Sequence, residues 1–170
     1  MLGVSLDGTL MNAGRTRHSR TLYNTAILDK IARLKNPQVA IITNQTEVPF
    51  SYQSNLYRTP EKLTRDLSGL IQRIFARGIK VSSIFICTYN PSVEYEVCKR
   101  AAEEIANAFA KHTVLSAVHV EVVYGPESGK PNPLMLILAK ITEFWGDDDC
   151  DEKAAAACEV PFHRMESFYG

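Results

Sequence analysis

The chain has 170 residues, of which 45% are apolar and 22% carry a charge, and its formal net charge is zero. This length suits one domain with a hydrophobic core of its own, and the composition is ordinary for a soluble globular protein. The neutral charge balance argues against a broad basic face for duplex nucleic acid, but it leaves room for a small pocket that takes one phosphorylated end.

The sequence contains no run of 18 or more apolar residues and no basic segment followed by an apolar one at its start, so we expect neither a membrane span nor a signal peptide. Its four cysteines are too few and too scattered for a disulfide framework. We therefore expect a reduced, cytoplasmic protein.

The first element is a short apolar run, residues 1–4, followed by Ser5-Leu6-Asp7-Gly8-Thr9. This pattern predicts a buried parallel strand that opens into a turn. Ligands of open α/β sheets bind outside the carboxyl ends of the strands. We therefore expect Ser5 and Asp7 to project into a site, with Gly8 allowing the backbone to turn away.

A polar stretch, residues 11–20, follows and is predicted to be a loop at the mouth of that site. It contains Arg15, Arg17 and Arg20. Two interpretations stay open: the loop is simply solvated, or one of its arginines binds a substrate phosphate, because a guanidinium group matches phosphate oxygens.

The remaining chain alternates between helical and strand patterns, which predicts a parallel sheet covered by helices on both faces. Residues 47–58, between the second strand and the next helix, are predicted to form a loop. His119 falls on the exposed side of a strictly alternating strand, so we interpret it as a surface residue. The predicted helices are Thr21–Leu34 (with Ile27, Ile31 and Leu34 inward), 59–78, Val93–His112, Leu134–Lys140 and Ala154–Ala157, and the predicted strands are 39–42, Ser82–Cys87, Val118–Val122 and Thr142–Trp145.

Polar residues that could bind a ligand or take part in catalysis occur at three more of these junctions. The strand at 39–42 ends in Thr43-Asn44-Gln45, which places short, uncharged donors at the sheet edge. Lys130 stands just before a predicted helix, where an anion binds well. The segment around it fails as a Walker motif, because the glycine spacing is wrong and no Ser or Thr follows the lysine.

The last strand runs into a strongly acidic turn, Asp147-Asp148-Asp149-Cys150-Asp151. Four carboxylates in five positions repel one another, and a hard divalent cation with oxygen ligands relieves that repulsion. The alternative is an acidic, solvated turn.

Taken together, these signals resemble the four motifs of the haloacid dehalogenase-like (HAD) phosphatases. The opening stretch resembles motif I, four apolar residues and D-x-D-G-T, except that Ser5 occupies the position of the first aspartate. T-N-Q at 43–45 resembles motif II, and K-P-x-P at 130–133 resembles motif III. G-D-x-x-x-D at 146–151, followed by an alanine-rich helix and V-P-F at 160–162, resembles motif IV.

The T-N-Q form is shared by histidinol phosphatases, heptose-bisphosphate phosphatases and polynucleotide 3'-phosphatases. Some members carry a zinc loop that starts at a cysteine matching Cys87. Here no histidine occurs at 89 and no later C-x-C pair exists, and Cys87 and Cys98 alone cannot complete a four-ligand zinc site. We therefore expect a free, buried Cys87 and no zinc.

The resemblance covers about residues 1–165 and implies a fold: a three-layer, Rossmann-like parallel sheet with helices on both faces. The whole chain, 1–170, then forms a single HAD-like domain. The spacing between motifs leaves no room for a large cap domain, so the site is open to macromolecular ends or bulky phosphates.

By resemblance, the chemistry is phosphoryl transfer to an aspartate and hydrolysis of the aspartyl phosphate. Asp7 is then the general acid and base, Thr43 and Asn44 hold the phosphoryl group, and Lys130 balances its charge. Mg2+ is the expected cofactor. Its expected ligands are the motif I positions Ser5 and Asp7, together with Asp147, Asp148 and Asp151.

Ser5 departs from this scheme, because a serine hydroxyl without a base is a poor nucleophile and supplies no carboxylate to the metal. Either Ser5 was introduced to silence a working phosphatase, or the chain is naturally a non-catalytic HAD domain that binds a phosphorylated ligand. We expect an inactive or impaired phosphomonoesterase of the polynucleotide 3'-phosphatase type, with a sugar or histidinol-type phosphatase as the alternative substrate class.

Overall fold

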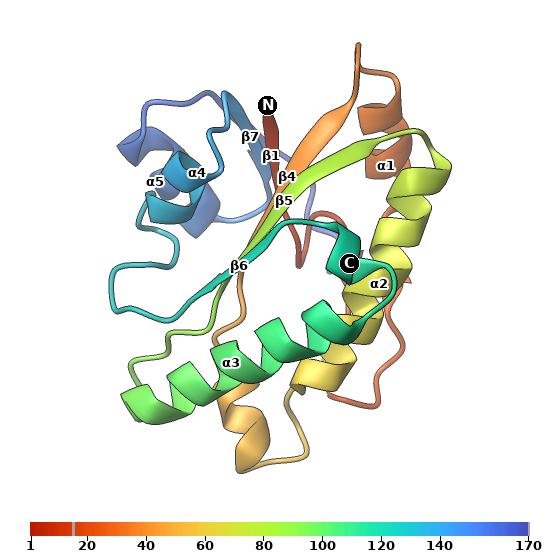
Figure 1. Cartoon of the computed structure of the whole chain (residues 1–170). Coiled ribbons are helices and arrows are strands. Elements are labelled where there is room, and N and C mark those ends of the chain that lie inside the picture. Colours follow the sequence, from red (N-terminus) through yellow and green to blue (C-terminus); the bar gives the residue numbers. More distant parts are fainter. Residues whose placement is uncertain (15, 170) are drawn as a thin grey trace.

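The computed structural model describes residues 1–14 and 16–169, and its centre is a six-stranded sheet (Figure 1). Every neighbouring pair of strands in this sheet runs parallel. The strand order is β6-β5-β4-β1-β7-β8, formed by β1 (Leu2–Ser5), β4 (Gln38–Asn44), β5 (Lys80–Cys87), β6 (Val120–Val123), β7 (Glu143–Gly146) and β8 (Phe162–Arg164).

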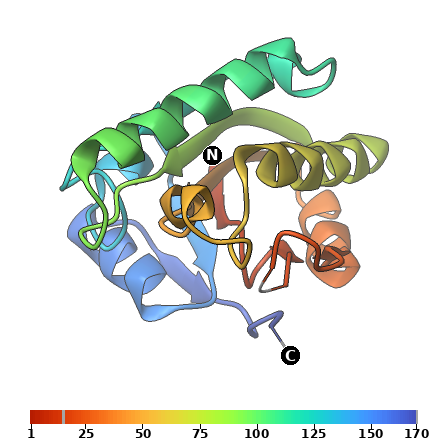
Figure 2. The ribbon, with the colours of Figure 1, turned by 90° about the horizontal axis from the view of Figure 1, so that it is seen from below.

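Helices cover both faces of the sheet, which makes the chain a three-layer α/β protein with a Rossmann-like architecture (Figures 1 and 2). One face carries α1 (Thr25–Ala32), α2 (Pro60–Ala76) and α3 (Tyr95–Lys111), and the other carries α4 (Leu134–Leu138) and α5 (Asp149–Ala157). Two 3-10 helices, η1 (Val48–Tyr52) and η2 (Leu115–Ala117), and a two-stranded sheet of β2 (Met11–Asn12) and β3 (Leu22–Tyr23) complete the described part of the chain.

Strand alternation divides the core into two clusters, one on each side of the sheet. In β4, Val39 and Ile41 join the cluster under α1–α3, whereas Ala40 and Ile42 join the one under α4 and α5. Apolar residues on both sides are what a parallel strand covered on both faces requires. The predicted layer architecture is therefore confirmed.

The topology creates a crevice at the carboxyl end of β1. The chain passes from β1 outward through β4, β5 and β6, and then returns to place β7 and β8 on the other side of β1. In open α/β sheets the ligand site lies at such a reversal of strand order. Figure 2 looks onto this edge, where the loops after β1 and β4 and the last residues of the chain meet.

The first helix differs from the sequence prediction. It begins at Thr25 rather than Thr21, because Leu22 and Tyr23 pair with β2. Its buried residues are Leu28 and Ile31, whereas Leu34, predicted to point inward, is 42% exposed. The stripe predicted from spacing was thus wrong at Leu34, which lies beyond the end of the helix.

Several other boundaries also moved. The predicted loops 11–20 and 47–58 contain β2 and η1, and β8 was not predicted. Helix α4 stops at Leu138 with Pro133 as its N-cap, and α5 starts at Asp149, five residues before the predicted start. His119 lies on the surface, as predicted. Among the described residues, none of the helices combines the length and apolar character needed to cross a bilayer.

Candidate functional site

A pocket of about 320 Å³ lies at the carboxyl edge of the sheet, and we call it the strand-edge pocket. It brings together residues from all four sequence signals. Six of the predicted site residues line it, namely Ser5, Asp7, Thr43, Asn44, Lys130 and Asp148. The other two, Asp147 and Asp151, form a cluster with Asp148 in which one ligand atom of each lies within 4.8 Å of the others.

The turn after β1 sets the positions of Ser5 and Asp7. Gly8 has φ +81°, a backbone conformation that side chains disfavour. A Cβ at Gly8 would lie 2.2 Å from an oxygen of the Asp147 carboxylate. Glycine at this position therefore allows the turn and also the close approach of Asp147, as the sequence predicted for the turn.

Lys130 occupies the centre of a buried polar group. Its ammonium nitrogen donates to the Ser5 hydroxyl at 3.0 Å and pairs with the Asp151 carboxylate. The side chain of Lys130 is 5% exposed and that of Asp151 is fully buried. Because the other Asp151 oxygen accepts the main-chain N–H of Asp147 at 3.1 Å, Asp151 fixes both Lys130 and the acidic turn.

Asn44 and Thr43 are arranged differently from each other. The Asn44 side chain donates to the Lys130 carbonyl at 2.8 Å and accepts from the Lys130 main-chain N–H at 3.0 Å, so it holds the lysine loop against β4. Thr43 is buried, and its hydroxyl accepts from Gln45 at 2.9 Å. Both line the pocket, and their predicted contact with a phosphoryl group stays a prediction.

Asp7 is held by a residue that the sequence analysis did not select. Arg58 grips both carboxylate oxygens of Asp7, at 2.9 and 3.1 Å, and Gln45 donates to the same carboxylate at 2.8 Å. Burial would lower the pKa of the Arg58 guanidinium, but the contact with Asp7 outweighs it and the pKa is raised. Arg58 therefore stays charged and orients the Asp7 carboxylate.

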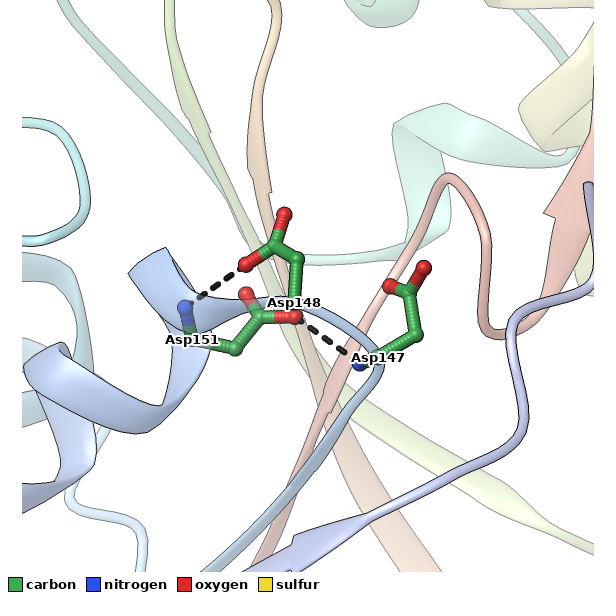
Figure 3. Close-up of side chains that lie close together, drawn as sticks. All are labelled: Asp147, Asp148 and Asp151. Atoms are coloured by element: carbon green, nitrogen blue, oxygen red, sulfur yellow. Dashed lines mark hydrogen bonds between the residues drawn. The ribbon is translucent and has the colours of Figure 1, made fainter.

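The acidic turn has the donor set that a hard cation prefers. Asp148 caps α5 by accepting the Asp151 main-chain N–H at 2.8 Å, and Figure 3 shows this bond beside the one from Asp147 to Asp151. The Asp147 carboxylate accepts hydroxyl hydrogen bonds from Thr9 at 3.1 Å and Ser167 at 3.2 Å. Among the described residues, neither the Asp147 nor the Asp148 carboxylate has a cationic partner within ion-pair distance.

Carboxylates outnumber cationic side chains around the pocket, which favours binding of a divalent cation. Burial raises the pKa of Asp147, and the neighbouring carboxylates of Asp151 and Asp148 raise it further. Two oxygen-donating carboxylates are thus available to a metal such as Mg2+. Within the described part of the chain, the pocket lining and the cluster of Asp147, Asp148 and Asp151 together hold five carboxylates, with Asp7 and Glu47 as the other two, against the two cations Arg58 and Lys130.

The last described residues fold back onto this edge. Met165 donates its main-chain N–H to the Gly146 carbonyl, and Phe168 donates its N–H to the Gly8 carbonyl, both at 2.7 Å. Tyr169 lines the strand-edge pocket. Burial raises the pKa of its hydroxyl, with Asp7 and Asp147 adding to the shift, so this phenol stays protonated at neutral pH.

The arginine prediction for the loop at 11–20 has a mixed outcome. Arg17 points to main-chain carbonyls of Ser51 and Ser54, at 2.9 and 3.0 Å, rather than into the strand-edge pocket. Arg20 is exposed, and Arg15 lies outside the described residues. The arginine of the pocket is Arg58, whose sequence signal was its place directly before the Thr59-Pro60 start of α2.

The cysteines agree with the prediction of a free, buried Cys87. Cys87 and Cys98 are both buried and unbridged. Burial raises the pKa of the Cys87 thiol to about 11, so it remains protonated at neutral pH.

Comparison of the chain with protein-family models, with curated proteins and with solved structures gave no match.

Proposed function

We propose that the chain is an HAD-type phosphatase domain whose pocket binds a phosphomonoester together with Mg2+, and whose catalytic step is disabled by Ser5. One observation carries the proposal. Four separate stretches of sequence, each resembling one HAD motif, supply side chains to the strand-edge pocket or to the acidic turn directly behind it. Such convergence at the carboxyl end of β1 is what a shared phosphate and cation site requires.

In this proposal, Lys130 meets the phosphoryl group from its position beside Ser5, and Thr43 contributes its hydroxyl from the end of β4. Asp147 and Asp148 would hold Mg2+, while Asp151 keeps Lys130 in place. Bound Mg2+ would supply positive charge to the phosphate oxygens and polarise the phosphorus centre. It would also offset the excess of carboxylates, which otherwise repels an anionic ligand.

The surroundings of Ser5 explain why we expect little hydrolysis. A serine attacks phosphorus only when a base takes its proton. The contact to its hydroxyl among the described residues is the side-chain nitrogen of Lys130, which donates to Ser5 and forms an ion pair with Asp151. Ser5 therefore accepts a hydrogen bond instead of losing a proton, and the pocket retains its shape without an activated nucleophile.

For the ligand, we place a polynucleotide 3'-phosphate first and a small sugar or amino-alcohol phosphate second. The ranking rests on the T-N-Q resemblance at 43–45, on the lack of the zinc loop in the sequence and on an open site. In the described residues between β1 and β4, the regular elements are the small β2–β3 sheet and α1, which supports a site without a large cover. A non-catalytic phosphate-binding domain is the competing proposal from another functional class, and Ser5 is the residue that favours it.

Calorimetric titration with inorganic phosphate and phenyl phosphate, with and without Mg2+, tests the proposal. We expect binding that depends on Mg2+ and weakens by roughly tenfold to a hundredfold in Lys130→Met, since a charge-assisted hydrogen bond contributes ~1.5–3 kcal/mol. Lys153→Met is the matched control, because Lys153 is exposed on α5 and does not line the pocket.

Circular dichroism must show that Lys130→Met is folded. Thr43→Val keeps the buried ion pair and is a second variant of the same site, in which phosphate binding should also weaken. If the wild-type chain binds neither ligand at millimolar concentration with Mg2+ present, the proposal is wrong.

A further inference from the structure

A second polar cavity, of about 400 Å³, lies beside the strand-edge pocket, and we call it the basic cavity. No part of the proposed phosphatase site uses it. It is formed by the loop after β2, by β3 and by the first turns of α2. Its lining residues are Arg17, His18, Ser19, Thr21, Tyr23, Lys62, Arg65 and Asp66.

The basic cavity is lined by three basic side chains (Arg17, Lys62 and Arg65) and one carboxylate, Asp66. This carboxylate already has hydrogen-bond and ion-pair partners. Asp66 accepts from Lys62 at 2.9 and 3.1 Å and from the Thr21 hydroxyl at 2.6 Å, and Arg58 lies 3.5 Å away. The charge of Lys62 is thereby offset. Arg17 and Arg65 are left as the cations of the cavity that have no carboxylate partner among the described residues.

Arg17 is fixed without being neutralised. Its Nη2 donates to the two carbonyl oxygens of Ser51 and Ser54, which hold the guanidinium in place but carry no net charge. Its Nε–H is buried and, in the part of the chain that the structure describes, has no hydrogen-bond partner. A guanidinium that lines a cavity, is held in place and has no carboxylate partner among the described residues favours an anion with several oxygens, such as a phosphate.

The two cavities are neighbours, because one side chain separates them. The Arg58 guanidinium contacts Asp7, which lines the strand-edge pocket, at 2.9 Å, and Asp66, which lines the basic cavity, at 3.5 Å. Along the backbone, Thr16 lines the strand-edge pocket and the next residue, Arg17, lines the basic cavity. Arg58 therefore stands between a lining residue of each cavity, so the two cavities adjoin at this side chain.

We infer that the basic cavity is a second anion subsite, and that the ligand of this protein carries two phosphate groups, one for each cavity. This inference rests on the proposed function for the first phosphate. The second phosphate is held by Arg17 and Arg65. A nucleic-acid end and a small sugar bisphosphate share this chemistry.

Isothermal titration with matched ligand pairs, in the presence of Mg2+, tests the inference. One pair is deoxyadenosine 3'-monophosphate and deoxyadenosine 3',5'-bisphosphate, and the other is glucose 1-phosphate and glucose 1,6-bisphosphate. The wild-type chain is expected to bind at least one bisphosphate about tenfold or more tightly than its monophosphate, and the gain should shrink as salt is raised. The pair that shows the gain identifies the source of the second phosphate.

The variants separate the two subsites. Arg65→Gln changes an exposed residue and should remove most of the bisphosphate gain while leaving the monophosphate dissociation constant unchanged. Arg33→Gln, exposed on the surface and outside both cavities, should change neither. Equal binding of both members of each pair by the wild-type chain, or a gain that persists in Arg65→Gln and in Arg17→Gln, overturns the inference.

The same titrations distinguish a wrong proposed function from a wrong second subsite. If a bisphosphate binds in an Arg65-dependent manner while monophosphates and inorganic phosphate do not bind, the basic cavity stands and the strand-edge assignment falls. If no ligand of the set binds, both are wrong.

Discussion

Replacing Lys130 by methionine removes the cation that neutralises a fully buried carboxylate. Lys130 is 5% exposed and Asp151 is 0% exposed, so neither charge can turn to water. Methionine fills a similar volume but leaves Asp151 with the Asp147 main-chain N–H at 3.1 Å as its remaining hydrogen-bond donor among the described residues. Breaking a buried ion pair in this way costs about 3–5 kcal/mol of unfolding free energy. In a chain of this size, such a loss lowers Tm by roughly 6–20 °C.

Urea denaturation of four proteins measures this effect: the wild type, Lys130→Met, Asp151→Asn and the double variant. Each single change leaves the other member of the pair buried without its ion-pair partner. The unfolding free energy of the double variant should therefore exceed the value expected from adding the two single effects by ~1–3 kcal/mol. Lys153→Met, on the exposed side of α5, is expected to stay within about 0.5 kcal/mol of the wild type. A cost below about 1 kcal/mol for Lys130→Met, or strict additivity in the double variant, would refute the buried pair.

Three further predictions concern the residues around this pair. The pKa of Asp147 is raised in the folded chain, so ionisation of this carboxyl opposes folding at neutral pH. Asp147→Asn should therefore raise Tm at pH 7 without Mg2+. The gain in Tm should vanish once the pH falls below the ordinary carboxyl range, where Asp147 is protonated in both states. Equal gains at pH 7 and pH 3 would contradict this assignment. Gly8→Ala should destabilise the chain by ~1–3 kcal/mol in thermal unfolding, because of its φ of +81° and the 2.2 Å approach of a Cβ to Asp147; an unchanged Tm would show that the turn is misassigned. Alkylation followed by mass spectrometry should modify the exposed Cys150 well before the buried Cys87, and equal rates in the folded chain would contradict the burial of Cys87.

The sheet could be predicted from the sequence because its central strands are continuous apolar runs and an edge strand, predicted at 118–122, alternates strictly. Residues 39–42 face two cores at once, so they carry no polar side, and this pattern has few alternatives to a covered parallel strand. The polar residues that follow such runs, Ser5 and Thr43 among them, were therefore assigned to one edge of the sheet, where they do line one pocket.

The ends of helices and strands were harder to predict from the sequence, because they depend on tertiary contacts. The segment 21–24 has a helical pattern, but Leu22 and Tyr23 pair with β2, and the Thr21 hydroxyl donates to Asp66 on α2 at 2.6 Å. Neither contact leaves a local signal. The early start of α5 is the opposite case: Asp148 has an N-cap side chain, but the acidic run was interpreted as a metal site or a solvated turn and not as the start of a helix.

The pocket residues that the sequence analysis missed come from segments without regular structure. Arg58 follows a loop whose path back to β1 depends on the packing of η1, so its contact with Asp7 has no periodic signal. Tyr169 reaches the pocket because Phe168 bonds to the Gly8 carbonyl, an interaction between residues 160 positions apart. Gln45 belonged to the T-N-Q signal, but its role in holding Asp7 became clear only from the geometry.

In the proposed function, Ser5 alone separates this pocket from a working phosphatase. Steady-state hydrolysis of an aryl phosphate and of a 3'-phosphorylated oligonucleotide, with Mg2+, tests it most directly in the wild type, in Ser5→Asp and in Ser5→Asp combined with Asp7→Asn. Loss of a nucleophile costs roughly four to six orders of magnitude in rate. We therefore predict negligible turnover in the wild type, a rise of about that size in Ser5→Asp, where the new carboxylate would stand beside the Lys130 ammonium, and near silence when Asp7 is also changed. Full activity in the wild type, or a folded Ser5→Asp that binds phosphate and Mg2+ but does not hydrolyse either substrate, would contradict the account.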